Sequence, residues 1–277
     1  MTPTIAEKRE RFAELHKGPG VFVMPNPWDV GSTMYLASLG FPALATTSRG
    51  MAFAAGKPDG GVTRAHALRH ISELVAATSL PVNADFEAGF AANADALYES
   101  AKLCIGTGVA GFSIEDYTGD PGAPFYTLVE AADRIRAARA AINASGQRVL
   151  LTARSEVVLH GHSGGLAEAL TRLTAYAEAG ADVLYAPGLK TADAVAEVVR
   201  AAGALPVNVL VGSPGFTTRQ LEDLGVRRIS TGAALARSAW VAFMRAAREI
   251  AADGRYEAFA DTAHFGDLTA LFRDQRA

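Results

Sequence analysis

The chain has 277 residues, 49% of them hydrophobic and 20% charged, which is ordinary for a globular protein with a large core. The net charge of −3 and the lack of a long basic run argue against a nucleic-acid partner. No stretch reaches the roughly 18 apolar residues of a membrane span, and the N-terminus lacks a signal-peptide core, so we expect no membrane partner. The single cysteine, Cys104, excludes an intrachain disulfide and favours a reducing, cytoplasmic setting.

Short apolar runs alternate with helical patterns along the whole chain. The first half predicts a helix at 5–17, a strand at 21–24, a helix at 28–40, a strand at 43–47, a loop at 48–61, a helix at 63–79, a strand at 81–85, a helix at 94–107 and a strand at 110–115. After a loop, the second half predicts a helix at 128–145, a strand at 148–153, a helix at 166–179, a strand at 181–185, a helix at 191–202, a strand at 206–210, a helix at 218–224, a strand at 227–230, a helix near 233–252 and a mixed helical stretch at 256–272.

This alternation implies parallel strands. Eight strand–helix units in roughly 250 residues are the number and length typical of a (β/α)8 TIM-type barrel. We therefore predict one barrel domain over residues 1–277, with a helical extension at about 253–277, although two smaller domains also fit the length. The rival fold, a doubly wound open sheet, would more often have a glycine-rich phosphate turn after its first strand, where this chain reads P-N-P-W-D.

Asp85 and Glu87 close the third predicted strand, in L-P-V-N-A-D-F-E-A-G-F. Residues two apart on a strand point to the same face, so the two carboxylates leave the strand side by side. Paired acids are costly to bury unless a cation or protons offset them, and oxygen donors suit Mg²⁺ or Mn²⁺. Two solvated loop acids would explain the pair equally well, but other strand ends carry similar groups.

Barrel enzymes build their sites at the C-terminal ends of the strands, which converge on one mouth. Several acids and an arginine at such a mouth suggest a small anionic substrate held between a metal ion and the guanidinium group. A metal ion facing a 2-oxo acid would stabilise an enolate as it forms. The polar residues at or near strand ends are Thr47, Ser48, Asp85, Glu87, Glu115, Asp116, Arg154, Asn208, Ser230 and Thr231.

Seven segments in order resemble the isocitrate lyase/phosphoenolpyruvate mutase superfamily. They are T-T-S-R-G-M-A, the P-D-G at 58–60, N-A-D-F-E-A-G-F, G-V-A-G-F-S-I-E-D, L-T-A-R-S, A-G-A-D-V-L-Y-A-P-G and P-V-N-V-L, spread over about residues 20–240. The P-G-L and L-G-V-R-R-I-S-T-G segments look most like its phosphonomutase-like branch. The resemblance implies a TIM barrel and an Mg²⁺-dependent (or Mn²⁺-dependent) reaction through an enolate next to a 2-oxo acid.

The same resemblance implies roles for individual residues. Asp85 would bind the metal directly, while Asp59, Glu87 and Glu115 would hold its water molecules. Arg154 would bind and polarise the reacting anion, which makes Arg154 and Glu115 the expected catalytic residues. The expected substrate-binding residues are Thr47, Ser48, Arg49, Gly50, Arg154 and Asn208, with the backbone at 49 and 50 contacting a carboxylate or phosphonate.

The chain departs from the family after the fourth strand. Isocitrate and methylisocitrate lyases, which this chain resembles, carry a mobile K-[KR]-C-G-H loop at that position. This chain instead reads Y-T-G-D-P-G-A-P-F-Y. The glutamate that 2-methylisocitrate lyases place after the sixth strand is also missing from Ala186-Pro187-Gly188, and the Lys/Asn loop of the mutase is absent. These departures disfavour a tricarboxylate lyase and put phosphonomutase activity in doubt. The replacement loop has the glycines and prolines of a lid.

Three functions remain. We favour an Mg²⁺-dependent lyase or decarboxylase that cleaves a carbon–carbon bond in a small 2-oxo or 2-hydroxy dicarboxylate, such as oxaloacetate or a substituted malate. The second is a phosphonopyruvate hydrolase or carboxyphosphonate phosphonomutase, acting on a P–C bond. The third is a catalytically quiet barrel that binds a metabolite.

The remaining expectations concern single residues and partners. We expect Cys104 to be a small core residue, His160 and His162 to be structural or to contact substrate, and Arg227-Arg228 to be a surface pair. The resemblance implies a homodimer or homotetramer in which the helix near 233–252 is exchanged between subunits. The apolar residues of 256–272, including Phe259, Phe265 and Phe272, need a cover, which the chain's own barrel could also provide.

Overall fold

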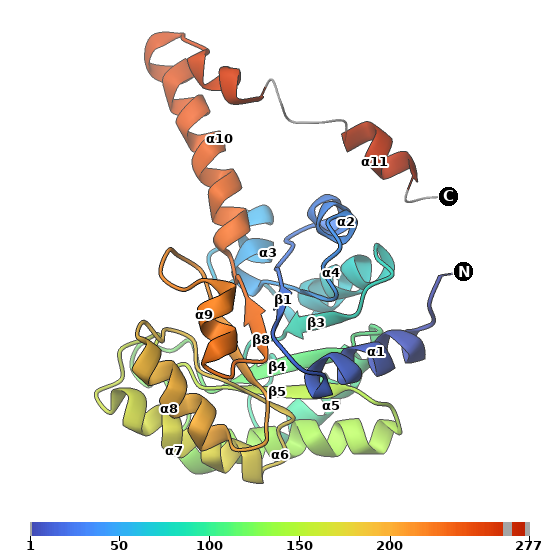
Figure 1. The fold of residues 1–277 in the computed structure, drawn as a ribbon, viewed down its shortest axis with the longest axis vertical. Coiled ribbons are helices and arrows are strands. Elements are labelled where there is room, and N and C mark those ends of the chain that lie inside the picture. Colours follow the sequence, from blue (N-terminus) through green and yellow to red (C-terminus); the bar gives the residue numbers. More distant parts are fainter. Residues whose placement is uncertain (1, 263–267, 275–277) are drawn as a thin grey trace.

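The computed structural model describes residues 2–262 and 268–274 and contains an eight-stranded, all-parallel sheet in the order β1-β8-β7-β6-β5-β4-β3-β2 (Figure 1). The strands are β1 (Phe22–Met24), β2 (Leu44–Ala45), β3 (Val82–Asp85), β4 (Gly111–Glu115), β5 (Leu150–Arg154), β6 (Val183–Tyr185), β7 (Val207–Leu210) and β8 (Arg228–Ser230). The helices are α1 (Ile5–Lys17), α2 (Val30–Ser38), α3 (Ser48–Ala54), α4 (Arg64–Ala76), α5 (Ala94–Gly106), α6 (Leu128–Ser145), α7 (Gly165–Glu178), α8 (Ala192–Ala202), α9 (Thr218–Asp223), α10 (Ala234–Asp253), the 3₁₀ helix η1 (Glu257–Thr262) and α11 (Leu268–Asp274).

The two ends of this strand order, β1 and β2, meet at a seam that nearly closes the barrel. The backbone N–H of Ala45 donates to the carbonyl of Pro25 (3.1 Å), and Asn26 Nδ2 donates to the carbonyl of Thr46 (2.7 Å). Asn26 Oδ1 also accepts from the backbone N–H groups of Thr231 and Gly232, both at 2.9 Å. One buried side chain therefore ties the ends of β1, β2 and β8 together, and the predicted (β/α)8 barrel is confirmed.

The predicted strand ends agree with the structure to within two residues. The predicted loop at 48–61 is wrong in its first half, where the chain forms α3. Thr47 caps this helix by accepting from the backbone N–H of Gly50 (3.3 Å), and Met51 and Ala52 bury their side chains. The S-R-G sequence obscured a helix that is stabilised by its cap and its burial.

Helix α1 closes the end of the barrel at which the strands begin. Phe12 is fully buried against the barrel, and Lys8 and Arg9 reach inward to donate to backbone carbonyls, among them Thr78 O (2.5 Å) and Val109 O (2.8 Å). Cys104, on α5, is fully buried, so its predicted place in the core is confirmed; burial also raises the pKa of its thiol. Helix α1 therefore plugs the interior of the barrel at this end, and the interior is open towards the opposite mouth.

Helix α10 projects away from the barrel, η1 lies at its far end, and α11 lies near α2 (Figure 1). Phe272 of α11 approaches Gly31 of α2, so one apolar residue of the C-terminal stretch is covered by the chain's own barrel. Phe265 lies outside the described residues. Within 2–262 and 268–274, no helix has both the length and the apolar character needed to cross a membrane.

Candidate active site

Asp85 ends β3 at the mouth of the barrel, and both of its carboxylate oxygens are engaged. Oδ2 accepts from the backbone N–H of Ser48 (3.0 Å) and from Ser48 Oγ (2.8 Å). Oδ1 lies 3.2 Å from Nη1 of Arg154. The first turn of α3 and the end of β5 therefore fix the carboxylate from two sides, in a partly buried position.

Arg154 stands at the end of β5 and gathers three carboxylates around one guanidinium group. Nη1 lies 3.2 Å from Asp85 Oδ1 and also 3.2 Å from Glu115 Oε2, while Nε donates to Glu156 Oε1. The guanidinium also lies 5.3 Å from the ring centroid of Tyr185. One positive charge against three negative ones leaves this site with an excess of negative charge that protons or a cation can offset.

Glu87 and Glu115 are two carboxyl groups of this mouth whose pKa is raised. Burial, followed by the charges of Asp85 and Asp59, raises the pKa of Glu87 to about 8. Burial also raises the pKa of Glu115 well above its ordinary value, although Arg154 opposes that shift. Glu87 Oε1 is buried and has no hydrogen-bond partner in the described structure. An unpaired buried oxygen among crowded acids is a position that a cation would satisfy.

The donor set fits a hydrated divalent ion better than a closed metal cage. Within the described residues, no three histidine, cysteine, aspartate or glutamate side chains are arranged to hold an ion between them. Mg²⁺ keeps several of its waters and takes only one or two carboxylates, so Asp85 as the direct ligand suffices. Glu87, Glu115 and Asp59 could then hold water molecules, and all of these donors are oxygens, as Mg²⁺ and Mn²⁺ prefer.

The α3 residues divide between the cavity and the packing beneath it. Arg49 pairs with Asp59 through two contacts of 2.7 Å to the same carboxylate oxygen, and both side chains are largely exposed. Gly50 is buried, and a Cβ there would lie 2.9 Å from Trp28 Cβ and 2.6 Å from Thr47 Cγ2. Gly50 therefore allows close packing, and its N–H already donates to Thr47.

Two adjoining cavities share Ser48, Arg49, Asp59 and Arg154. The inner cavity, about 110 Å³, reaches into the barrel, where Asn208 lines it. The outer cavity is about 450 Å³ and opens past Glu115. The structure thus brings every predicted site residue except Gly50 to one mouth: Thr47, Ser48, Arg49, Asp59, Asp85, Glu87, Glu115, Arg154 and Asn208.

Asp116, next to Glu115, is turned away from this mouth and is structural. It is buried and accepts from Tyr176 OH (2.7 Å), from the backbone N–H of Glu156 (2.7 Å) and from Arg172 Nη1 (3.0 Å). These bonds join the ends of β4 and β5 to α7. Asp116 therefore holds the framework on which Arg154 and Glu156 sit.

Sequence reasoning missed Glu156, which is almost completely buried beside Arg154. Burial works to raise the pKa of Glu156, but the charge of Arg154 and the hydrogen bonds from His160 and Arg154 together outweigh burial, so the pKa is lowered. Its second oxygen lies 3.1 Å from Nε2 of His160, whose ring stacks on Tyr117 at 4.0 Å. The sequence does contain a signal for Glu156: it follows Arg154 by two residues at the end of β5, just as Glu87 follows Asp85 at the end of β3. His160 lines the outer cavity, and its predicted structural or substrate-contacting role stays a prediction.

The predicted surface pair Arg227-Arg228 is wrong for Arg228, which is buried inside the barrel. On β8 the side chains of Arg228 and Ser230 share one face, as residues two apart do. Both line the inner cavity together with Asn208. Arg227 lies at the other end of the barrel, half-buried.

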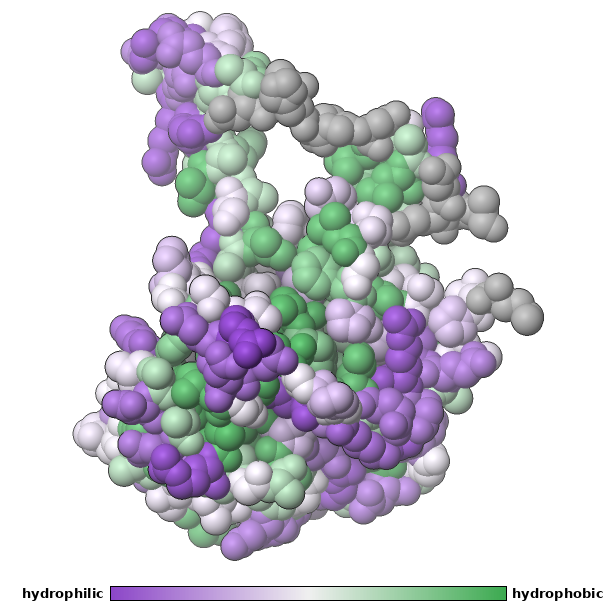
Figure 2. Space-filling view, in the orientation of Figure 1, coloured by the Kyte–Doolittle hydropathy of each residue, from purple (hydrophilic) through white to green (hydrophobic). Residues whose placement is uncertain are grey.

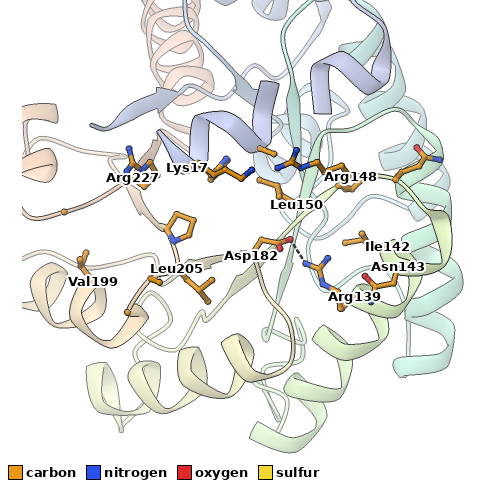
Figure 3. Close-up of a pocket in the computed structure, with 18 of the residues that line it drawn as sticks. Lys17, Arg139, Ile142, Asn143, Arg148, Leu150, Asp182, Val199, Leu205 and Arg227 are labelled. Carbon is orange, nitrogen blue, oxygen red and sulfur yellow. Dashed lines mark hydrogen bonds and ion pairs between the residues drawn. The ribbon is translucent and has the colours of Figure 1, made fainter. Parts of the chain in front are cut away.

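A larger cavity of about 860 Å³ lies where the strands begin, lined in part by Lys17, Arg148, Asp182 and Arg227 (Figure 3). Its basic groups already have partners. Arg139 pairs with Asp182, as the dashed line in Figure 3 marks, while Arg148 pairs with Glu10 and Lys17 lies 3.0 Å from Glu14. Arg227 donates to the carbonyl of Gly20. Because barrel enzymes build their sites at the opposite end, where the strands finish, this cavity is a poor candidate for the active site.

Comparison with known proteins agrees with this geometry. The sequence pattern of the phosphoenolpyruvate phosphomutase family matches residues 12–251. The chloroplastic carboxyvinyl-carboxyphosphonate phosphorylmutase of Arabidopsis thaliana is 29% identical over 241 residues, which cover 83% of this chain and 70% of that protein. The match spans all eight strands, so it includes every strand end that contributes to the mouth.

Solved structures extend the agreement to three dimensions. A Burkholderia cenocepacia J2315 protein provisionally described as a lyase/mutase is 45% identical, with a TM-score of 0.92 over 99% of this chain and 98% of that one. A 2,3-dimethylmalate lyase of the PEP mutase/isocitrate lyase superfamily is 25% identical, with a TM-score of 0.82 over 99% of this chain and 95% of that one. The resemblance predicted from seven short segments is confirmed. This chain belongs to the phosphoenolpyruvate phosphomutase family, within the superfamily of PEP mutases and isocitrate lyases.

Proposed function

We propose that this protein is a lyase, dependent on Mg²⁺ or Mn²⁺, that breaks a carbon–carbon bond next to a 2-oxo or 2-hydroxy acid. The observation that carries the proposal is the ring of Asp85, Glu115 and Glu156 around Arg154, beside the proton-holding Glu87. A small inner cavity of about 110 Å³ favours a short dicarboxylate, of the size of oxaloacetate or a substituted malate. A cytoplasmic location stays a prediction.

The roles follow from the positions of the side chains. A bound divalent ion would supply positive charge next to the oxygen on which negative charge develops. Asp85 would hold that ion, and Ser48 keeps the Asp85 carboxylate in place through its N–H and hydroxyl groups. Arg154 would turn its donors from the acids to the reacting carboxylate of the substrate, which it can bind in a bidentate manner.

Carbon–phosphorus chemistry is the second candidate. The phosphoenolpyruvate phosphomutase pattern and the similarity to the Arabidopsis phosphorylmutase favour it. A guanidinium group binds phosphonate as readily as carboxylate, so the anion site permits both reactions. The absence of the family's Lys/Asn loop from Tyr117–Tyr126 of the sequence weighs against a mutase and makes the lyase our first choice.

Pyruvate release, coupled to lactate dehydrogenase, tests the proposal. Oxaloacetate, substituted malates, methylisocitrate and phosphonopyruvate are each assayed with Mg²⁺, with EDTA and with the Asp85→Ala variant. We expect turnover that needs the metal and falls at least about 100-fold in Asp85→Ala, because both charge stabilisation and positioning are lost. Asp133→Ala, which removes an exposed acid on α6, is the matched control and should keep full activity.

The best substrate decides between the two reactions. Fastest turnover of oxaloacetate or a malate supports carbon–carbon cleavage, and fastest turnover of phosphonopyruvate supports P–C chemistry. No pyruvate from any of them, with Mg²⁺ bound to folded protein, would contradict the decarboxylase, the malate lyase and the phosphonopyruvate hydrolase. It would leave a reaction on an untested substrate that gives another product, or a barrel that binds a metabolite without turnover.

A further inference from the structure

Arg228 is an arginine in the interior of the barrel, at the inner end of the substrate cavity. It is 2% exposed and lines that cavity from β8. Its Nε donates to Asn208 Oδ1 (2.8 Å), its Nη2 donates to Thr152 Oγ1 (3.0 Å), and its Nη1 lies 3.3 Å from His16 Nε2. These contacts join β8 to two other strands, β5 and β7, and to α1, so each nitrogen of the guanidinium group has a partner.

None of these three partners carries a compensating charge. Asn208 and Thr152 are uncharged, and His16 is neutral because burial, followed by the charge of Arg228, lowers its pKa to about 3. Burial lowers the pKa of Arg228 to about 9, so the guanidinium still carries its charge at neutral pH. A buried cation with only neutral partners is unfavourable unless an anion comes to it. The cavity that Arg228 lines is where such an anion can bind.

The donors of Arg228 also decide how its neighbours are oriented. A guanidinium group has no acceptor, so each partner must present one. His16 satisfies this with Nε2 as acceptor, since its Nδ1 lies 2.8 Å from the carbonyl of Phe12 and must carry the proton. Asn208 satisfies it with Oδ1, which places its Nδ2 on the other side, where one N–H donates to Ser230 Oγ (3.0 Å). The second N–H of Nδ2 remains for a ligand.

We propose that Arg228 is a positioning residue that turns the Asn208 amide so that it donates to a substrate carboxylate, and that its charge compensates that carboxylate. The proposal deepens the proposed function and rests on it. It divides the mouth into two parts of opposite character. The part around Asp85 and Glu87 is acidic and suits a divalent cation, and the part around Arg228 and Asn208 is positive and attracts an anion. The substrate is then an acid with a carboxylate at each end.

The two parts predict opposite responses to the loss of one positive charge. Arg228→Gln should weaken the binding of oxalate, a small dianion, at saturating Mg²⁺ by at least about tenfold. It should leave the affinity for Mg²⁺ alone unchanged or make it higher, because a repelling charge is gone. Arg228→Lys keeps the positive charge but loses the forked set of guanidinium donors, so it should lose less oxalate affinity than Arg228→Gln. Arg227→Gln, which changes the adjacent arginine at the far end of the barrel, should bind as wild type does.

Isothermal titration calorimetry with Mg²⁺ alone, then with oxalate in Mg²⁺, gives both affinities without turnover. Weaker oxalate binding with retained Mg²⁺ binding supports the proposal. Equal oxalate affinity in Arg228→Gln and wild type overturns it, as does a parallel loss of both ligands, which would mark a purely structural role. If Arg228→Gln does not fold, Arg228→Lys decides: weaker oxalate binding with retained Mg²⁺ binding supports the proposal, and oxalate affinity equal to that of wild type overturns it. Wild-type protein that binds neither ligand would instead contradict the proposed function itself.

Discussion

His16 is a buried histidine that the fold keeps neutral. Its ring lies 4.6 Å from the ring of Phe12 and 5.1 Å from that of Phe22, both edge-on, with Arg228 on a third side. Burial and then the charge of Arg228 lower its pKa to about 3. In the unfolded chain the imidazole titrates near its ordinary value of about 6.5. Between these two values the unfolded state binds a proton that the folded state does not.

Stability should therefore fall as the pH falls below about 6.5, and a part of that loss should belong to His16. Since the folded pKa is the lower one, the linkage relation gives a loss of roughly 2 kcal/mol between pH 7 and pH 5. His16→Gln keeps an acceptor for Arg228 and cannot titrate, so it should lose about that much less than wild type. Urea unfolding of both proteins at the two pH values measures the difference in their loss of unfolding free energy. The contributions of the carboxylates are the same in both proteins and cancel in that difference. Equal losses in the two proteins would contradict the prediction.

At the scale of elements, the turn after β3 carries a left-handed backbone at three positions. Glu87 has φ 50°, Gly89 has φ 80° and Phe90 has φ 52°. A Cβ on Gly89 would lie 2.0 Å from Leu97 Cδ1, so α5 packs directly on this turn. Strained backbone of this kind persists where the surrounding structure holds it, and here it keeps the Glu87 carboxyl group close enough to Asp85 for that charge to raise its pKa.

Gly89→Ala should destabilise the protein by at least about 2 kcal/mol, since it adds both left-handed strain and an overlap with Leu97. It should also weaken Mg²⁺ binding, because Glu87 can no longer keep its place. Gly106→Ala is the matched control: this glycine ends α5, has no neighbour within 4 Å of a new Cβ, and should be neutral or slightly stabilising. Thermal unfolding and Mg²⁺ titration provide the measurements, and a Gly89→Ala protein as stable as the Gly106→Ala control would refute this account.

The strands were predictable because each is a short apolar run between turn residues, and Asp85 and Arg154 were predictable because barrel chemistry gathers at strand ends. Helix α3 was not, although its cap Thr47 stands directly before it, because the seven-residue helix contains Gly50 and its burial depends on partners such as Trp28 that lie elsewhere in the sequence. Arg228 was hidden for a similar reason. A charged residue is expected at the surface, and only Asn208, Thr152 and His16, far away in the sequence, make its burial possible.

At the scale of the whole molecule, α10 presents an apolar face that the described residues leave largely exposed. Trp240, Phe243 and Met244 share one side of the helix and are 37%, 61% and 37% exposed, with the first two rings 5.5 Å apart. Figure 2 shows hydrophobic residues on this projecting helix, among hydrophilic ones. A projecting amphipathic helix of this kind suits a contact with a second copy of the chain.

The predicted dimer or tetramer therefore stays a prediction, and light scattering checks it. We expect wild-type protein to have the mass of an oligomer and Phe243→Glu to shift it towards the monomer, because a charge would be buried in the contact. Val129→Glu, which changes an exposed apolar residue of α6, should leave the mass unchanged. A monomeric wild-type protein would exclude the expected exchange of α10 between subunits.

The pairing of β1 with β8 has a consequence for folding of the protein during its synthesis on the ribosome. Phe22 is paired with Arg228, about 200 residues further on, so the first strand emerges on the order of 10–40 s before its partner at ordinary rates of synthesis. During that interval α1 and β1 have no barrel to join, and His16 has no Arg228 to contact. The last strand to be made is thus the one that completes both the wall of the barrel and the positive end of its cavity.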